Sequence, residues 1–225
     1  MEQYLLYFMA IGLVFWAQTK VKGAYTRYSQ METSSRMSGA QVARQILDDN
    51  GLSDVAVKTS KSAMLSDHYD PKNKIVFLSP KVYAETSIAS VAIAAHEVGH
   101  AIQHAENYSA IVVRNAILPF AIVSGNAGWV VCFIGLAASF DLLIWIGLGM
   151  LGVIALFQLV TLPVELNASS RALNILLADG IVNSEEQGAA KSMLSAAAFT
   201  YIAALLATLL QILRIVLLAG SRRRR

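Results

Sequence analysis

The chain has 225 residues, of which 56% are hydrophobic and 15% charged, and its mean hydropathy is +0.52. Soluble domains carry about 25% charged residues, so this composition indicates an integral membrane protein. The formal net charge is +3, and the four arginines at 222–225 alone contribute +4, so the rest of the chain is nearly neutral. A neutral body with a basic tail excludes a nucleic-acid-binding surface. A single cysteine, Cys132, excludes a disulfide framework.

Four uncharged stretches are candidates for membrane spans: Gln3–Thr19, Ala116–Phe140, Leu142–Val164 and Ser192–Leu213. A helix needs about 20 apolar residues to cross the hydrocarbon core. The first stretch follows Glu2 rather than a basic segment and lacks a small-residue cleavage site, so we expect a retained anchor and not a signal peptide. The short connection around Ser139 predicts that the middle two form a helical hairpin. The sequence thus predicts a mainly α-helical protein with about four spans.

The polar segment at residues 20–110 contains turn residues between short apolar runs. Apolar side chains at helical spacing predict a helix over Gln41–Asp49, closed by Asn50 and Gly51. Asp70–Asn73 has the composition of a turn between two strands, and Ser79 followed by Pro80 is typical of a helix start. Three short apolar runs are expected as strands or parts of strands: Asp54–Lys58, Ala63–Ser66 and Lys74–Leu78. This pattern predicts a small α+β subdomain.

A long helix is predicted from about Ser87 to about Ala105, and it contains the sequence His-Glu-Val-Gly-His at residues 96–100. Two histidines four residues apart lie on one helical face, so both imidazoles can bind one Zn²⁺ ion. Glu97 is rotated by about 100° from His96 and can act on a water beside the ion without binding the ion itself. Gly99 costs about 1 kcal/mol relative to alanine inside a helix, and we expect another backbone to approach there. The pattern therefore predicts a hydrolytic zinc site with Glu97 as the general base.

A catalytic zinc ion usually has three protein ligands and one open position. Four residues are candidates for the third ligand, and we favour Glu165, which follows a long uncharged span. His104 lies one turn beyond His100, but a straight helix cannot easily place three histidines around one ion. His68 and Asp70 lie in a predicted turn, where such residues are usually solvated.

Three segments carry a resemblance to a known family: residues 66–71 (Ser-Asp-His-Tyr-Asp-Pro), residues 96–104 (His-Glu-Val-Gly-His-Ala-Ile-Gln-His) and residues 165–172 (Glu-Leu-Asn-Ala-Ser-Ser-Arg-Ala). Together with the order of apolar spans, they resemble the YugP-type membrane zinc metallopeptidases, the neutral zinc metallopeptidase family. More remotely the chain is similar to the HtpX and CAAX-prenyl-protease clan of membrane gluzincins. In that clan a glutamate on a later helix completes the zinc site, which implies Glu165. The clan commonly has an aspartate one turn later, where this chain has Ser169.

The resemblance implies a zincin-like catalytic subdomain that bears the metal-binding helix. We expect the chain to consist of five parts. These are a membrane anchor (1–19), the catalytic subdomain (20–110), a transmembrane hairpin (111–164), a third-ligand helix with an insert (165–195), and a membrane helix with a basic tail (196–225). The expected activity is that of a membrane-embedded zinc endopeptidase acting on membrane-associated or misfolded polypeptides. The expected partners are a polypeptide substrate and the lipid bilayer, without nucleic acid. The alternative is a catalytically silent scaffold or chaperone-like binding protein that retains the fold.

Two features of the predicted active site stay open in the sequence. The donor that stabilises the oxyanion has four candidates: His68, His104, Asn167 and Arg171. An extended substrate is expected to add to the edge of a sheet, and Lys74–Leu78 is the candidate strand. That strand would equally suit an ordinary hairpin that covers the core.

Positive charges argue in two directions about topology. Lys20, Lys22, Arg27 and Arg36 follow the first span and favour a cytoplasmic catalytic side, whereas Arg222–Arg225 favour a cytoplasmic C-terminus. We favour a multi-pass protein of the bacterial plasma membrane with its catalytic side in the cytoplasm, and protease accessibility of terminal tags tests this topology. A transporter is disfavoured because the spans hold few ionisable residues beyond Asp141 and Arg214.

Overall fold

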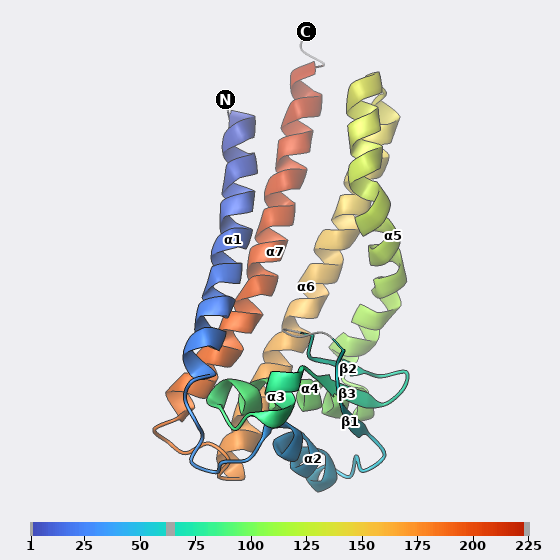
Figure 1. Cartoon of the computed structure of the whole chain (residues 1–225). Coiled ribbons are helices and arrows are strands. Elements are labelled where there is room, and N and C mark those ends of the chain that lie inside the picture. The colour runs from blue at the N-terminus through green and yellow to red at the C-terminus, as the bar shows by residue number, and fades with distance from the viewer. Residues whose placement is uncertain (1, 62–65, 223–225) are drawn as a thin grey trace. The chain divides into compact units, whose positions relative to one another are not determined.

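The computed structural model describes residues 2–61 and 66–222 and is mainly helical (Figure 1). Its elements, in chain order, are α1 (Glu2–Tyr28), α2 (Gly39–Asp49), β1 (Ala56–Thr59), β2 (His68–Asp70), β3 (Ile75–Leu78), α3 (Pro80–Ala84), α4 (Ile88–Ala105), α5 (Ser109–Ala138), α6 (Asp141–Ala178) and α7 (Gln187–Arg222). They form two compact units. The helical unit comprises residues 1–18, 109–163 and 199–225, and the mixed unit comprises residues 19–108 and 164–198.

Among the described residues, four helices are long and apolar enough to cross a membrane, which matches the predicted number of candidate spans: Gln3–Tyr28, Ser109–Ala138, Asp141–Ala178 and Gln187–Ser221. Each is longer than its uncharged stretch because the helix continues into polar sequence. Arg223–Arg225 of the predicted basic tail lie outside the described residues.

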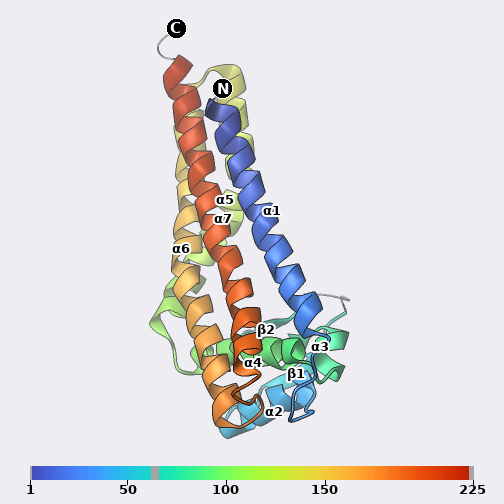
Figure 2. The same ribbon diagram turned by 90° about the vertical axis from the view of Figure 1, so that its left-hand side faces the viewer.

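Within the helical unit, α1 and α7 lie side by side, as do α5 and α6 (Figures 1 and 2). Trp16 of α1 packs edge-on against Phe199 of α7, with ring centroids 5.1 Å apart. The predicted hairpin is present between α5 and α6. At Gly135 an added Cβ would lie 2.7 Å from the backbone nitrogen of Ile144, so the two helices approach closely where only hydrogen fits. Ser139 makes the tight connection with a φ of 56°.

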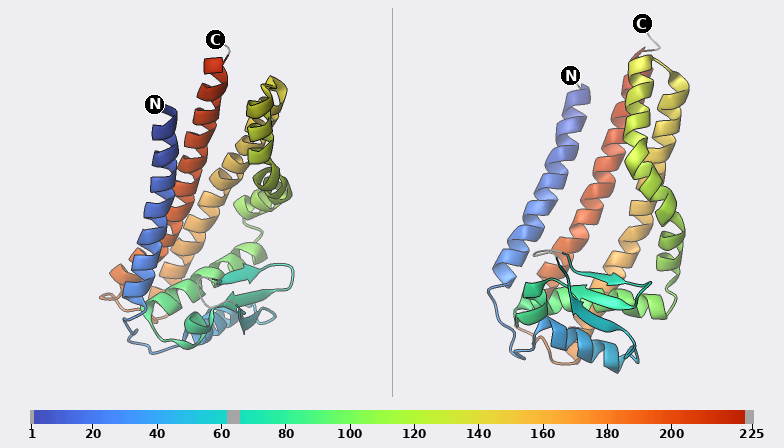
Figure 3. Two further views of the ribbon diagram at one scale, coloured as in Figure 1. Left: turned by 45° about the horizontal axis from the view of Figure 1, so that its top comes forward. Right: turned by 45° about the vertical axis from the view of Figure 1, so that its right-hand side comes forward.

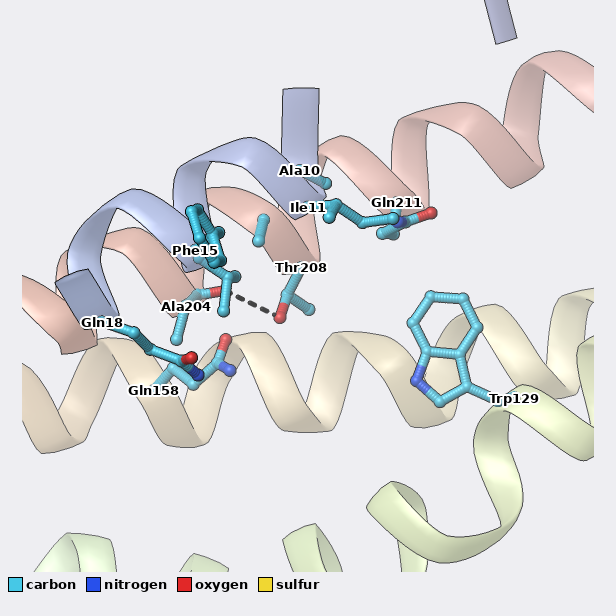
Figure 4. Close-up of a pocket in the computed structure, with 11 residues that line it drawn as sticks. Ala10, Ile11, Phe15, Gln18, Trp129, Gln158, Ala204, Thr208 and Gln211 are labelled. Carbon is cyan, nitrogen blue, oxygen red and sulfur yellow. Dashed lines mark hydrogen bonds between the residues drawn. The ribbon is translucent and has the colours of Figure 1, made fainter. Parts of the chain in front are cut away.

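A cavity of about 510 Å³ lies among the helices of this unit. Its wall is mostly apolar, with polar side chains from three helices: Gln18, Gln158, Thr208 and Gln211 (Figure 4). The Thr208 hydroxyl donates a hydrogen bond to the carbonyl of Ala204 in its own helix, 3.0 Å away. The candidate metal ligands His96, His100 and Glu165 do not line this cavity.

In the mixed unit, α2 and the sheet pack against α4 (Figure 3). Helix α2 begins with a capping box in which Ser38 and Gln41 satisfy each other's backbone amides, and its predicted apolar face is fully buried. Gly51 ends this region with a φ of 70°, a conformation that favours glycine. The predicted helices over Gln41–Asp49 and from about Ser87 to Ala105 are therefore confirmed.

The sheet has the order β1-β3-β2, which corrects two expectations. His68 and Asp70 are not turn residues, because His68–Asp70 forms β2 and pairs antiparallel with β3. The turn at residues 70–73 connects these two strands, as expected, whereas most of the predicted run Ala63–Ser66 lies outside the described residues. Strand β3 pairs with β1 on one side and β2 on the other, so it is the central strand. The expectation that Lys74–Leu78 offers a free edge to a substrate is wrong.

Candidate metal centre

Helix α4 places His96, Glu97 and His100 in the interior of the mixed unit. Ser87 caps the helix by accepting a hydrogen bond from the backbone N–H of Ser90, and the helix is buried along most of its length. The two imidazole rings lie one turn apart, with centroids separated by 4.7 Å and planes inclined by 82°. The four-residue spacing therefore brings both rings to one face, as helical geometry requires.

Helix α6 crosses α4 at Gly99, where its backbone comes unusually close. A Cβ added at Gly99 would lie 2.9 Å from the carbonyl oxygen of Ala168 and 3.3 Å from its Cα. No side chain fits there without a shift of one helix. The expected close approach of a second backbone is confirmed, and it brings the α6 segment that follows Pro163 next to the two histidines.

Glu165 of α6 lies close to both imidazoles and is 5% exposed. Its Oε2 atom lies 3.3 Å from Nε2 of His96 and 3.7 Å from Nε2 of His100. One donor atom from each of the three residues lies within 4.8 Å of the others. Ligands about 2.0–2.1 Å from a tetrahedral zinc ion are separated from each other by roughly 3.4 Å. The three donors therefore fit a zinc ion in both chemistry and spacing.

The outer nitrogen of each imidazole also has a partner. Nδ1 of His96 lies 3.2 Å from the hydroxyl of Ser169, and Nδ1 of His100 lies 3.0 Å from Oε1 of Gln103. Such partners orient metal-binding imidazoles. Ser169 lies one helical turn after Glu165, so a hydroxyl, and not a carboxylate, faces His96 here. Gln103 was missed in the sequence, although its position three residues after His100 places it on the same face.

The Glu97 carboxyl group is buried beside the three donors. Burial raises its pKa above the ordinary value for glutamate, and the charge of the two histidines opposes only part of this rise. For His100, burial disfavours the cation, but hydrogen bonding to Glu165 and the charges of Glu97 and Glu165 outweigh it and raise the pKa. A carboxylate with a raised pKa is a stronger proton acceptor, which is the property a general base needs.

The other residues considered for the third position have different partners. His104 has its Nδ1 3.1 Å from the hydroxyl of Tyr69, and the His68 ring stacks on Phe77 with centroids 5.0 Å apart. Asp70 accepts hydrogen bonds from the backbone amides of Lys72 and Asn73 in the turn. Within the described parts of the chain, only His96, His100 and Glu165 form a group of three such donors.

Comparison with known proteins identifies the family to which the chain is similar. Residues 3–220 match the model of a family described as "Putative neutral zinc metallopeptidase". The chain is 44% identical over 209 residues to "Putative membrane protease YugP" of Bacillus subtilis (strain 168), covering 93% of this chain and 92% of that protein. No solved structure matches the chain. Because the family model spans nearly the whole sequence, the chain belongs to the neutral zinc metallopeptidase family.

Proposed function

We propose that the protein is a membrane-embedded zinc endopeptidase with a zincin-like, gluzincin-type site. His96, His100 and Glu165 hold Zn²⁺, and Glu97 is the general base. The observation that carries this proposal is the placement of the buried Glu97 carboxylate on the same helix as two of the donors, but outside the group of three. A purely structural metal site has no need of such a carboxylate.

When bound, zinc supplies Lewis acidity that polarises a scissile carbonyl and makes water more acidic. Glu97 takes a proton from the attacking water as its oxygen bonds to the carbonyl carbon. Glu97 then delivers this proton to the amide nitrogen, so that the C–N bond breaks and a neutral amine leaves. Ser169 and Gln103 hold the two imidazole rings during these steps. The substrates proposed are membrane-associated or misfolded polypeptides at the plasma membrane.

Removal of the metal tests this function directly. Treating the purified protein with a chelator is expected to abolish cleavage of a casein-like substrate, and Zn²⁺ is expected to restore it, because all three donors converge on one position. The measurement is the rate of peptide release together with the zinc content. Full activity in protein shown to be free of metal would contradict the proposal.

We further propose that β2, and not β3, binds the substrate main chain. Among the described strands, β2 lies at one edge of the sheet. Tyr69 on this strand contacts His104, so β2 runs beside the helix that bears the histidines. Main-chain hydrogen bonds to an edge strand bind extended peptides with little sequence preference.

Backbone N-methylation of a peptide substrate tests the binding mode at β2. Methylating one amide that pairs with the strand removes a hydrogen-bond donor, so we expect a raised KM and a roughly tenfold lower kcat/KM. The matched control is a peptide methylated at an amide too far along the chain to pair with any of the three residues of β2. Equal cleavage of all the methylated peptides would argue against binding through this edge.

A further inference from the structure

The two candidate histidine ligands differ in what holds their outer nitrogens. His96 faces a hydroxyl, whereas His100 faces the amide of Gln103, whose side chain is 0% exposed. We infer that Gln103, itself oriented by Val164 and Asn167, is a positioning residue that holds the proton of His100 on Nδ1. The Nε2 lone pair of His100 then faces the metal position. This inference rests on the proposed function, in which His100 binds zinc.

The orientation of the Gln103 amide follows from two groups whose hydrogen-bonding roles are unambiguous. The backbone carbonyl of Val164 can only accept, and it lies 2.8 Å from Nε2 of Gln103. Arg171 can only donate, and its Nε donates to Oδ1 of Asn167 at 2.8 Å. The same Oδ1 accepts a second hydrogen bond from Gln103 Nε2 at 2.9 Å. Both contacts therefore require the Gln103 nitrogen to point toward α6.

The remaining atom of the amide, Oε1, then faces His100. An amide oxygen only accepts, so the Nδ1 atom 3.0 Å away must carry a hydrogen. A neutral imidazole carries one such hydrogen, and Nε2 is therefore left with its lone pair. A metal ion can bind Nε2 only in this tautomer, because the lone pair of that nitrogen is then free to coordinate it.

Gln103 opposes the tautomer that the neighbouring carboxylate would favour. Glu165 Oε2 lies 3.7 Å from His100 Nε2, and its negative charge would attract a proton to that nitrogen. Moving the proton would leave two acceptors, Nδ1 and Gln103 Oε1, facing each other in a buried position, which is costly. The amide therefore favours the neutral tautomer of His100 in which Nδ1 carries the proton.

The hydrogen bonds that orient Gln103 continue through Asn167 and Arg171 to an exposed residue. Arg171 pairs through Nη2 with Glu106, the C-cap residue that follows α4, at 2.7 Å. Asn167 and Arg171 were both candidates for the oxyanion donor. Their contacts with Gln103 and Glu106 instead assign them to the support of His100.

Nuclear magnetic resonance of ¹⁵N-histidine in the metal-free protein reads the tautomer directly. The chain has 4 histidines, and the signals of His100 are assigned by their loss in His100→Ala. At alkaline pH, where imidazoles are neutral, we expect the Nδ1-protonated form in the wild-type protein. In Gln103→Met we expect a shift toward the Nε2-protonated form. A wild-type protein with its proton on Nε2 of His100 would overturn the inference.

Zinc affinity, measured by competition with a chromophoric chelator, gives the second readout. We expect Gln103→Met and Asn167→Leu to lower the affinity by about 10–100-fold, the usual effect of losing an outer partner of a ligand. Asn167→Asp should retain affinity, because both carboxylate oxygens accept hydrogen bonds from Gln103 and Arg171. Gln187→Met, at an exposed position on α7, is the matched control.

The outcomes separate this inference from the proposed function. Unchanged affinity and tautomer in Gln103→Met would refute the positioning role while leaving the zinc centre intact. A wild-type protein that carries the Nδ1 proton but binds no zinc would support the tautomer and refute the proposed function. If Asn167→Asp and Asn167→Leu lose zinc affinity equally, the hydrogen bonds that residue 167 accepts from Gln103 and Arg171 do not support His100.

Discussion

Glu97→Gln is expected to lower the turnover of a casein-like substrate by about 10²–10⁴-fold, the usual contribution of a general base, while the protein keeps its zinc. The amide has nearly the same shape as the carboxylate but cannot take a proton from water. Because Glu97 is not one of the three donors, its replacement leaves the group at His96, His100 and Glu165 in place. The measurements are the initial cleavage rate and the zinc content of the same sample.

Glu185→Gln is the matched control, since it makes the same chemical change at an exposed position in the loop before α7. Its rate should equal that of the wild-type protein. This pair of variants also separates the endopeptidase from the silent scaffold, because a scaffold would show no cleavage that depends on Glu97. Wild-type turnover in Glu97→Gln would refute the proposed mechanism.

Glu165→Ala is expected to remove the metal itself. The carboxylate lies within 3.7 Å of both imidazole Nε2 atoms, and its loss leaves two ligands from one helix. We expect zinc affinity to fall by more than about 100-fold, beyond the loss caused by an outer partner, and cleavage to fall with it. Metal analysis after purification, compared with the wild-type protein, measures the effect.

His68→Ala and His104→Ala are the controls for this assignment, because the sequence also offered both residues as third ligands. Each should retain zinc at the wild-type level, since each has a partner away from the donor group. Thermal denaturation of all three variants checks that they remain folded. Zinc retained in Glu165→Ala, together with zinc lost in either histidine variant, would show that the third ligand is a different residue.

The helices that follow from local patterns in the sequence were predicted correctly. The apolar face of α2 and the apolar length of the four long helices depend on residues close together in the chain, where helical spacing alone decides which side chains share a face. Strand β2 was missed because its three residues, His68–Asp70, show no apolar alternation. The central position of β3 could not be foreseen, because pairing on both sides depends on strands distant in sequence.

The sequence by itself determined that His96, Glu97 and His100 adjoin one another, because a helix sets the direction of side chains three and four residues apart. Only the tertiary structure decided which of four candidate groups reaches the two imidazoles. Glu165 is 65 residues from His100, and it arrives there because α6 crosses α4 over the missing side chain of Gly99. The same crossing brings Ser169 to His96 and Asn167 to Gln103. Hydrogen bonds between such distant residues depend on separations of a few ångströms between two helices, and no periodicity within either helix encodes those separations.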